Sequence, residues 1–519
     1  MSCITFLPRT KKEIRLNTTM PQNASLVEQF EFNSTPITVI PGDGIGPEIT
    51  ASVLVILAAA GAGIDAEYVT AGEQVYRNGN TSGISEEAWE SIRRTRTVLK
   101  GPITTPQGGG YKSLNVTLRK TLGLYANVRP CRSYAPYIPT QHPAMNTVIL
   151  RENEEDLYAG IEHRQTDDVT QCLKLITRKG SERIVRYAFE YARRHGRKRV
   201  TCFSKDNIMK LTDGLFHRVF EEIAPEYPEI ESWHEIVDIG MANFVNRPET
   251  YDVVVLPNLY GDILSDIAVK MTGSVGMGGS VNIGPGAAIF EAIHGSAPDL
   301  PPDVANPSGL LLAAIEMLHQ IGKARQAQAI HNAWLVTLED GIHTKDIANP
   351  ATVRQVGTQE FTRAIIDRLG QTPKHLPAAE TWEKPAVSME AAAVETMERS
   401  SRNRDKEVKA LAGVDVFLDW TGGSPDELGM KLQAAAVGWL RLKMMTNRGV
   451  KVWPNGHPET LCTDHWRCRF QPAEPASVVT HHDIVLLLEA VEAAGLDFIK
   501  TENLYTFDGK PGYSLGQGQ

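Results

Sequence analysis

The chain has few cysteines, no long apolar run and no excess of basic residues. Its six cysteines are scattered over 519 residues without a Cys-x-x-Cys pair, which favours a reducing compartment over a disulfide-stabilised secreted fold. The longest apolar run, residues 49–64, contains Thr50 and Ser52 and is shorter than the ~20 residues of a membrane span. The 53 basic residues face 62 acidic ones, a net charge of −9, which argues against a nucleic-acid-binding surface. The composition predicts a cytoplasmic enzyme, with neither nucleic acid nor membrane as a partner.

The first residues carry a different signal for location. Residues 1–19 contain Arg9, Lys11, Lys12 and Arg15 against the single acid Glu13. Transit peptides are rich in arginine and poor in acids, so the mitochondrial matrix is the alternative location. The simpler interpretation is a disordered N-terminal extension over residues 1–35.

The chain contains neither of the common glycine-rich nucleotide fingerprints. G-x-G-x-x-G and the Walker-type phosphate loop are both absent from the sequence. The run Gly-Asp-Gly-Ile-Gly at residues 42–46 follows a short apolar segment and precedes Pro47, so it predicts a tight strand-to-helix turn. Any nucleotide site must therefore be built from other segments.

Alternating strand and helix patterns predict an α/β fold in the first two thirds of the chain. Apolar strands are expected at residues 37–40, 147–150, 199–203 and 252–256. One helix is expected from Pro47 to near Gly61, and another from a cap at Ser181 to His195, where Gly196 ends it. Near-continuous apolar strands between helices indicate a mostly parallel or mixed sheet that is covered on both faces.

The composition changes near residue 373. Prolines and charges replace the apolar periodicity up to residue 408, which predicts a linker. Beyond it, strands are expected at 414–418, 439–446 and 465–470, helices at 425–437 and 483–494, and a last strand follows. These elements predict a small α+β domain.

Two sets of charged residues are candidates for chemistry. Arg119, Arg129 and Arg151 could hold a multiply anionic substrate because the planar guanidinium matches a carboxylate, although spacing alone favours ordinary surface arginines. Asp262 and Asp266 are four residues apart, which places both carboxylates on one helix face. That pair fits a hard divalent ion or a solvated surface, and the spacing leaves both open.

Taken in order along the chain, seven segments resemble a known family. They are residues 40–48 (IPGDGIGPE), 100–106 (KGPITTP), 113–119 (SLNVTLR), 151–160 (RENEEDLYAG), 205–210 (KDNIMK), 258–266 (NLYGDILSD) and 294–298 (HGSAP). Together they resemble the isocitrate/isopropylmalate, or β-decarboxylating, dehydrogenases over about residues 37–369. Within that family the chain looks like the isocitrate-specific members, in a longer subgroup with an extra C-terminal domain.

The resemblance implies a two-domain dehydrogenase unit around a mixed sheet unlike the common dinucleotide-binding fold. A large cofactor-binding domain would comprise residues 36–127 and 290–372, and a small domain with dimer contacts and a clasp would comprise residues 128–289. Residues 373–408 would link this unit to an α+β assembly domain at 409–519. Active sites in the family are shared between subunits, so we expect a homodimer, which the C-terminal domain could extend to a tetramer.

The resemblance also implies oxidative decarboxylation of isocitrate to 2-oxoglutarate and carbon dioxide, a reaction of the tricarboxylic acid cycle. Tyr158 and Lys205, the latter from the partner subunit, would transfer protons. Mg²⁺ or Mn²⁺ would be held by Asp262, Asp266 and a partner subunit's Asp238. A non-catalytic regulatory subunit would lack some of these five residues, so their presence disfavours that alternative.

The same resemblance assigns the substrate-binding residues. Arg119, Arg129 and Arg151 would bind the carboxylates of isocitrate, with Ser113 and Asn115 at the distal one. Related isopropylmalate enzymes present a more apolar surface at these two positions. Because a site built from hydrogen-bonding groups rejects analogues that leave those groups unpaired, isocitrate is favoured and homoisocitrate is the nearest rival.

The expected cofactor depends on one loop. NADP-dependent members of the family typically have Lys-Tyr where Asp299-Leu300 lies here. An aspartate accepts hydrogen bonds from ribose hydroxyls and repels a 2′-phosphate, so we predict NAD, with NADP as the alternative because of Lys345. The predicted cofactor-binding residues are Thr104, Thr105, Glu291, His294, Gly295, Ser296, Ala297, Asp299, Leu300 and Asn306.

Overall fold

The computed structural model describes residues 34–80, 82–105, 113–379, 406–436, 438–474 and 478–516. The hypothesis of a transit peptide falls on residues 1–19, and most of the predicted linker on residues 380–405; both lie outside the described residues. Within the described ranges, none of the helices combines the length and apolarity needed to cross a bilayer.

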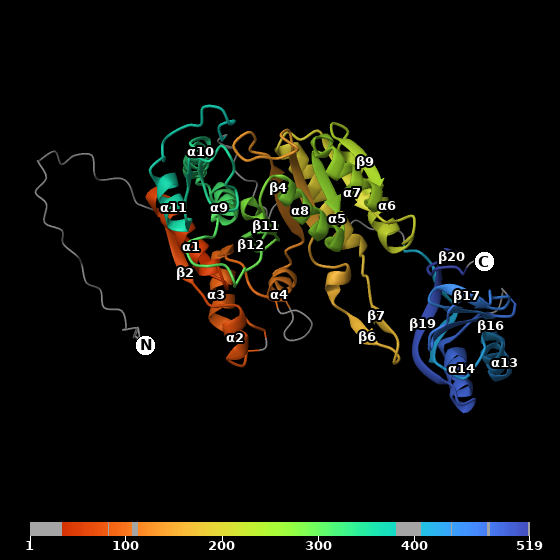
Figure 1. Cartoon of the computed structure of the whole chain (residues 1–519). Coiled ribbons are helices and arrows are strands. Elements are labelled where there is room, and N and C mark those ends of the chain that lie inside the picture. The colour runs from red at the N-terminus through yellow and green to blue at the C-terminus, as the bar shows by residue number, and fades with distance from the viewer. Residues whose placement is uncertain are drawn as a thin grey trace, which may run out of the picture.

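One ten-stranded mixed sheet forms the body of the first unit (Figure 1). Its order is β2-β1-β3-β12-β11-β4-β5-β10-β8-β9, with parallel pairing at both ends. The strands β11 and β4 pair antiparallel with their neighbours and join the two parallel halves. The strands are β1 (Thr35–Ile40), β2 (Ile64–Tyr68), β3 (Thr97–Lys100), β4 (Ala126–Arg132), β5 (Asn146–Glu152), β8 (Arg199–Ser204), β9 (Glu231–Ile236), β10 (Val253–Leu256), β11 (Gly279–Ile283) and β12 (Ala288–Ala292).

Helices cover both faces of this sheet. One face carries α1 (Gly46–Ala59), α5 (Arg178–Arg194), α6 (Thr212–Ile223), α9 (Ser308–Gln320), α10 (Ala324–Glu339) and α11 (Thr358–Ile366). The other carries α3 (Glu86–Thr95), α4 (Leu114–Thr121), α7 (Val237–Asn246) and α8 (Asn258–Met271). The short helix α2 (Glu73–Arg77) and the strand pair β13 (Ile342–His343) and β14 (Arg354–Gln355) complete the unit.

The apolar strand at residues 253–256 shows why the sheet is covered on both sides. All four residues of β10 are buried. Val253 and Val255 pack on the α5 and α6 side, whereas Val254 and Leu256 pack on the α7 and α8 side. Alternate side chains of a strand point to opposite faces, so a strand with no polar position needs two apolar layers. The expected mixed α/β sheet is confirmed, while the division of residues 36–372 into a large and a small domain stays a prediction.

The predicted cap at Ser181 is wrong. Helix α5 begins at Arg178, one turn earlier, and its N-cap is Thr177, whose side chain accepts from the Gly180 backbone N–H. Ser181 lies inside the first turn, and its hydroxyl donates to the Thr177 carbonyl. Both residues are good cap formers, and the extended backbone at Thr177 makes it the cap. The helix ends at Arg194, next to the expected stop at Gly196.

The glycine-rich turn at residues 42–46 joins three loops. Gly42 and Gly44 have φ of +79° and +56°, values that favour glycine. A Cβ on Gly42 would lie 2.2 Å from the Pro102 carbonyl oxygen, and one on Gly44 would lie 2.1 Å from the Ser296 carbonyl oxygen. Because neither glycine has a Cβ, the loops around residues 102 and 296 can both pack closely against this turn.

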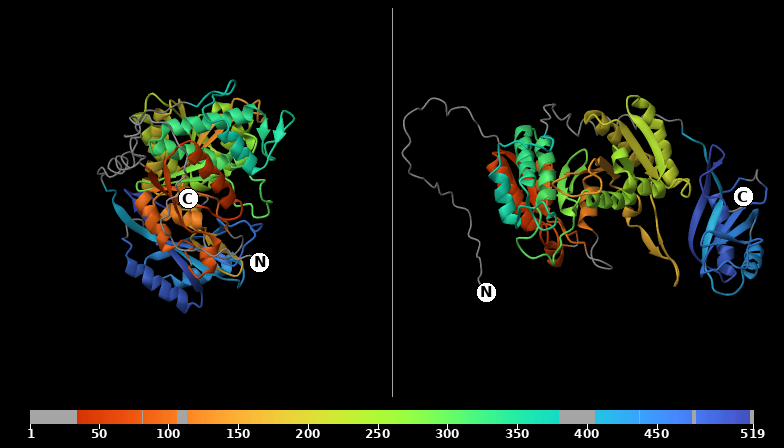
Figure 2. Two further views of the ribbon diagram at one scale, coloured as in Figure 1. Left: turned by 90° about the vertical axis from the view of Figure 1, so that its left-hand side faces the viewer. Right: turned by 45° about the horizontal axis from the view of Figure 1, so that its top comes forward.

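The C-terminal unit has its own sheet and core (Figure 2). Its antiparallel sheet has the order β17-β16-β18-β15-β19-β20, and its core includes Val414, Leu432, Phe470 and Leu487. The two strands β17 and β20 were not expected. The elements are β15 (Lys409–Asp419), α13 (Pro425–Ala435), β16 (Leu440–Asn447), β17 (Val450–Trp453), β18 (His465–Pro472), α14 (His481–Ala493), β19 (Asp497–Phe507) and β20 (Lys510–Pro511).

A hairpin of the first unit contacts the C-terminal unit. The hairpin consists of β6 (Glu162–Arg164) and β7 (Thr170–Cys172), and Figure 1 shows it extending from the sheet toward the C-terminal unit. The Asp464 carboxylate accepts hydrogen bonds from the Thr166 hydroxyl at 2.6 Å and from the Asp168 backbone N–H at 3.2 Å. Thr166 and Asp464 are both buried, so this contact is part of the packing between the two units.

Candidate active site

Two of the three predicted arginines are buried around one aspartate. Arg129 on β4 and Arg151 on β5 are 4% and 1% exposed. Both reach Asp262 on α8, Arg129 at 3.3 Å and Arg151 by a short contact from its Nη1. Arg129 also donates to Ser265 at 2.6 Å, and Arg151 Nε donates to Asn258 at 2.9 Å. These are not the surface arginines that the spacing alone favoured.

Tyr158 belongs to the same cluster. Its hydroxyl donates to Asp262 Oδ2 at 2.5 Å, and the Arg151 guanidinium lies 4.7 Å from the centre of its ring. Burial raises the pKa of Tyr158, and the hydrogen bond to Asp262 adds to this effect although Arg151 opposes it. The phenol therefore remains protonated at neutral pH.

Three buried polar atoms of the cluster have no hydrogen-bond partner within the described part of the chain: Arg119 Nε, Arg151 Nη2 and Asn115 Oδ1. Burial lowers the pKa of Arg151, and the nearby positive charges of Arg129 and Arg119 lower it further. The unpaired N–H groups of the two arginines, in a positively charged and buried setting, are matched by an anion with several oxygens, whereas Asn115 Oδ1 is an acceptor that needs a donor such as a hydroxyl. Arg119, Arg129 and Asn115 line one cavity of about 90 Å³ together with His294 and Gly295 of the predicted cofactor loop.

Glu291 connects two strands and an arginine in a buried network that the sequence did not predict. Lys100 Nζ lies 2.6 Å from Glu291 Oε2, and Arg119 Nη2 lies 3.1 Å from Glu291 Oε1. Burial alone would raise the pKa of Glu291, but Lys100 and Arg119 outweigh it and hold that pKa well below its usual range. Glu291 was predicted to bind cofactor, and here it fixes the position of Arg119. Lys100 and Glu291 are register partners on the parallel strands β3 and β12.

The predicted cofactor residues lie on neighbouring loops. The Thr104 and Ser296 hydroxyls are 2.7 Å apart, and the Thr104 N–H donates to Asp43 at 2.9 Å. Asn306 donates to Asp346 at 3.0 Å. Among the remaining predicted members, Thr105, whose hydroxyl donates to Ser113 at 3.3 Å, is exposed, as are Ala297, Asp299 and Leu300.

Lys205 and Asp238 form a separate pair. Lys205 Nζ lies 2.9 Å from Asp238 Oδ1, and this contact lowers the pKa of Asp238. Among the described residues, Asp238 does not join Asp262 and Asp266 in a group whose ligand atoms lie within 4.8 Å of one another. One chain therefore does not assemble all five predicted catalytic and metal-binding residues in one place.

Asp262 and Asp266 fit a divalent cation with a preference for oxygen. They lie one turn apart on α8, and both contact Arg129 at 3.3 Å. Burial raises the pKa of Asp266, and the neighbouring Asp262 carboxylate raises it further while Arg129 opposes the shift. Burial alone would also raise the pKa of Asp262, but the positive charges of Arg151 and Arg129 outweigh burial and lower this pKa. Two carboxylates that repel one another at a partly exposed position match the ligands that Mg²⁺ prefers.

Comparisons with known proteins show which family the chain is similar to. Residues 36–365 match the family described as isocitrate/isopropylmalate dehydrogenase, and residues 409–519 match the bacterial isocitrate dehydrogenase C-terminal domain. The chain is 51% identical over 492 residues to a Rickettsia felis protein named isocitrate dehydrogenase (NADP), covering 93% of this chain and 99% of that protein. A crystal structure of the TT0538 protein from Thermus thermophilus superimposes with a TM-score of 0.86 at 44% identity, covering 94% of this chain and 97% of the other.

The expectation of NAD as cofactor is wrong. The Rickettsia felis relative is named for NADP, whereas an Arabidopsis thaliana mitochondrial catalytic subunit named for NAD is 43% identical and covers only 68% of this chain and 94% of its own. The expectation assumed that Asp299 repels a 2′-phosphate at a partly buried contact. Asp299 is exposed, so water and salt reduce that repulsion to about the size of the attraction that the equally exposed Lys345 offers, and Asp299 does not decide the cofactor. Lys345, the residue that argued for NADP, is exposed as well.

Family matches over both units and a superimposable solved structure lead to one assignment. The chain belongs to the isocitrate/isopropylmalate dehydrogenase family and carries the C-terminal domain of the bacterial isocitrate dehydrogenases.

Proposed function

We propose that this chain catalyses the oxidative decarboxylation of isocitrate to 2-oxoglutarate and carbon dioxide, with NADP as oxidant and Mg²⁺ or Mn²⁺ as the metal. The observation that carries the proposal is the pair of buried, unpartnered guanidinium nitrogens, Arg119 Nε and Arg151 Nη2, within the described residues. Arg151 also contacts Asp262 and the Tyr158 ring, so the carboxylate oxygens of a bound tricarboxylate would accept from these guanidinium groups next to that pair.

The substrate is selected by its distal carboxylate. Arg119, Arg129 and Arg151 bind carboxylate oxygens, and Ser113 with Asn115 at the start of α4 supplies hydrogen bonds to the distal group. An isopropyl group in that position would leave these polar atoms unpaired, which costs more than the loss of one apolar contact. Homoisocitrate keeps the carboxylate and differs only in length, so it is the competing substrate to assay.

The chain's own residues transfer protons. Lys205 of a partner subunit removes the proton from the C2 hydroxyl, and Tyr158 protonates the enolate that remains after carbon dioxide leaves. The partner's Asp238 stays ionised beside that lysine and would hold the metal with Asp262 and Asp266. When bound, NADP accepts the hydride from C2 and the metal ion acts as a Lewis acid on the substrate oxygens. The arginines keep the substrate oriented throughout.

A second copy of the chain is needed for this arrangement. Lys205 and Asp238 pair with one another rather than with the Asp262 cluster of their own chain. Ile239 on α7 and Ile263 on α8 are large apolar residues with exposed fractions of 54% and 46%. A homodimer that packs α7 and α8 against their symmetry copies would cover them and bring Lys205 to the partner's Asp262.

Lys345→Ala is expected to raise the KM for NADP about tenfold or more and to leave the KM for NAD unchanged. The reason is that an exposed lysine and a nearly doubly charged 2′-phosphate attract by about 1–2 kcal/mol even in a water-like dielectric. Initial rates with each cofactor at saturating isocitrate and Mn²⁺ provide the measurement, and Lys374→Ala, another exposed lysine, is the control. The wild type should have the higher kcat/KM with NADP. A higher value with NAD would refute the cofactor assignment.

Removal of residues 406–519 is expected to yield a smaller oligomer that still folds and retains residual activity. The C-terminal unit has a separate core, and none of the proposed site residues lies in it. Light scattering and the isocitrate assay measure the outcome, with Asp464→Ala as a milder variant that removes the acceptor for Thr166. An unchanged number of chains per assembly after the truncation would exclude an assembly role for this unit.

A further inference from the structure

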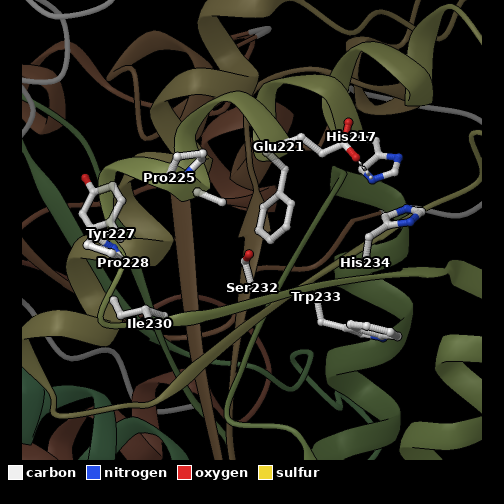
Figure 3. Close-up of a pocket in the computed structure, with 11 residues that line it drawn as sticks. His217, Glu221, Pro225, Tyr227, Pro228, Ile230, Ser232, Trp233 and His234 are labelled. Carbon is white, nitrogen blue, oxygen red and sulfur yellow. Dashed lines mark ion pairs between the residues drawn. The ribbon is translucent and has the colours of Figure 1, made fainter.

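A second cluster of ligand-type side chains contains the residue that follows Lys205, and neither Asp262 nor Asp266 belongs to it. It borders a cavity of about 660 Å³ between the end of α6 and the edge strand β9. Figure 3 shows His217 of α6 and His234 of β9 facing one another at one end of this cavity, while Trp233 points to the other side of the strand. Both imidazoles line the cavity, and His234 Nε2 lies 2.8 Å from the Ser204 hydroxyl, which an ion bound at this nitrogen would displace.

Asp206 completes the cluster from the loop after β8. His217 Nδ1 lies 2.7 Å from Asp206 Oδ2, and His234 Nε2 lies 4.0 Å from Asp206 Oδ1. One ligand atom from each of the three residues lies within 4.8 Å of the other two. No other set of three or more His, Cys, Asp or Glu ligands in the described ranges meets this criterion.

Two features of the cluster suit it to a metal ion. Asp206 Oδ1 is buried and has no hydrogen-bond partner among the residues that the structure describes, so one carboxylate oxygen is unsatisfied. Glu221 Oε1 lies 3.5 Å from His217 Nε2, the ring nitrogen opposite the one that faces Asp206 (Figure 3). A carboxylate on the far nitrogen is the usual outer partner of a metal-binding histidine, because it fixes the tautomer and the ring orientation.

Of the two imidazoles, that of His234 favours its neutral, ligating form. The two ring centroids are 3.4 Å apart with an interplanar angle of 15°, so two positive charges on the rings would repel strongly. Burial lowers the pKa of His234, and His217 lowers it further, while Asp206 and Glu221 oppose the shift. A neutral imidazole carries the lone pair that a metal ion needs.

We propose that Asp206, His217 and His234 form a binding site for a divalent transition-metal ion of the Zn²⁺ class, separate from the oxygen-rich site at Asp262 and Asp266. One carboxylate oxygen and two imidazole nitrogens are ligands that Zn²⁺ prefers, with water from the cavity in the fourth position. The stacked rings must tilt apart for both nitrogens to face one ion. Bound metal would join the loop after β8 to the edge strand β9.

The test is Zn²⁺ binding to the full-length protein, measured by calorimetry. The protein is first stripped of metal, and Mg²⁺ is then added in excess so that the oxygen-rich site is occupied. The wild type is expected to bind one more Zn²⁺ per chain than the His217→Ala/His234→Ala variant. Zn²⁺ should also raise the Tm of the wild type but not of the variant, because an ion that binds only the folded state stabilises it. His163→Ala, an exposed histidine on β6, is the matched control and should bind like the wild type.

A conservative variant keeps the test decisive if the double variant misfolds. Asp206→Asn retains the shape of the side chain and loses its charge, and we expect at least a tenfold weaker Zn²⁺ affinity. Glu221→Gln should weaken binding by about 10–100-fold through the orientation of His217. Failure of the wild type to bind Zn²⁺ in excess Mg²⁺ would overturn the proposal, as would equal stoichiometry and affinity in the wild type and Asp206→Asn.

Discussion

Tyr158→Phe is expected to lower kcat for isocitrate oxidation by about 10²–10⁴-fold, the range for loss of a positioned proton donor, with a much smaller change in the KM for isocitrate. The hydroxyl is 2.5 Å from Asp262, and burial raises its pKa, so it is present as the protonated phenol. Phenylalanine keeps the ring against which Arg151 packs at 4.7 Å. The variant thus removes the proton and preserves the substrate-binding arginine.

The kinetic parameters of Tyr158→Phe separate this role from a structural one. A residue that only supports the fold would lower the Tm and the amount of active enzyme, while the proposed role lowers kcat at an unchanged Tm. Tyr68→Phe, on a residue with 64% exposure, is the matched control and should behave like the wild type. A kcat for Tyr158→Phe within about threefold of the wild type would contradict the assignment as proton donor.

The layers of the fold could be predicted because they depend on local patterns. The apolar run at 252–256 and the glycine-rich turn at 42–46 each contain the information for their own structure. The sequence could not show whether Thr177 or Ser181 is the N-cap of α5, since both side chains suit that position. The extended backbone at Thr177, just before Arg178, decides between them. Strands β17 and β20 are short and depend on pairing with β16 and β19.

The burial of the arginines could not be predicted from spacing. It depends on the pairing of β4 with β5 and on the approach of α8, which brings Asp262 to residues more than 100 positions earlier in the chain. The Lys100–Glu291 contact likewise depends on the register of two parallel strands. The family resemblance identified three arginines as substrate ligands: Arg119, Arg129 and Arg151. The chemistry of the local sequence alone did not identify them.

The cofactor prediction failed for a related reason. The identity of Asp299 indicated repulsion of a 2′-phosphate, but the size of that repulsion depends on exposure, which the sequence does not show. An exposed pair of charges interacts several times more weakly than a partly buried one. The cluster of Asp206, His217 and His234 was missed as well, because its members lie on a loop, a helix and an edge strand with no recognisable spacing.

Chelation with EDTA is expected to abolish turnover, and Mg²⁺ or Mn²⁺ to restore it. Asp262→Asn should raise the metal concentration for half-maximal activity by at least about tenfold, since affinity in oxygen sites follows the number of charged ligands. Full activity after stringent chelation would contradict the metal assignment.

The same variant should also change how strongly isocitrate stabilises the metal-free protein, because Asp262 is the acceptor shared by Arg129 and Arg151. An asparagine there replaces a charge-assisted contact and leaves two buried cations facing one another, which destabilises the free enzyme more than the enzyme with a bound tricarboxylate. Isocitrate should therefore raise the Tm of Asp262→Asn by more than it raises that of the wild type when both are measured without metal. Asp65→Asn, on an exposed position of β2, is the control and should respond to isocitrate and to metal like the wild type. An equal Tm increase in Asp262→Asn and the wild type would mean that Asp262 holds the metal but does not balance the arginines.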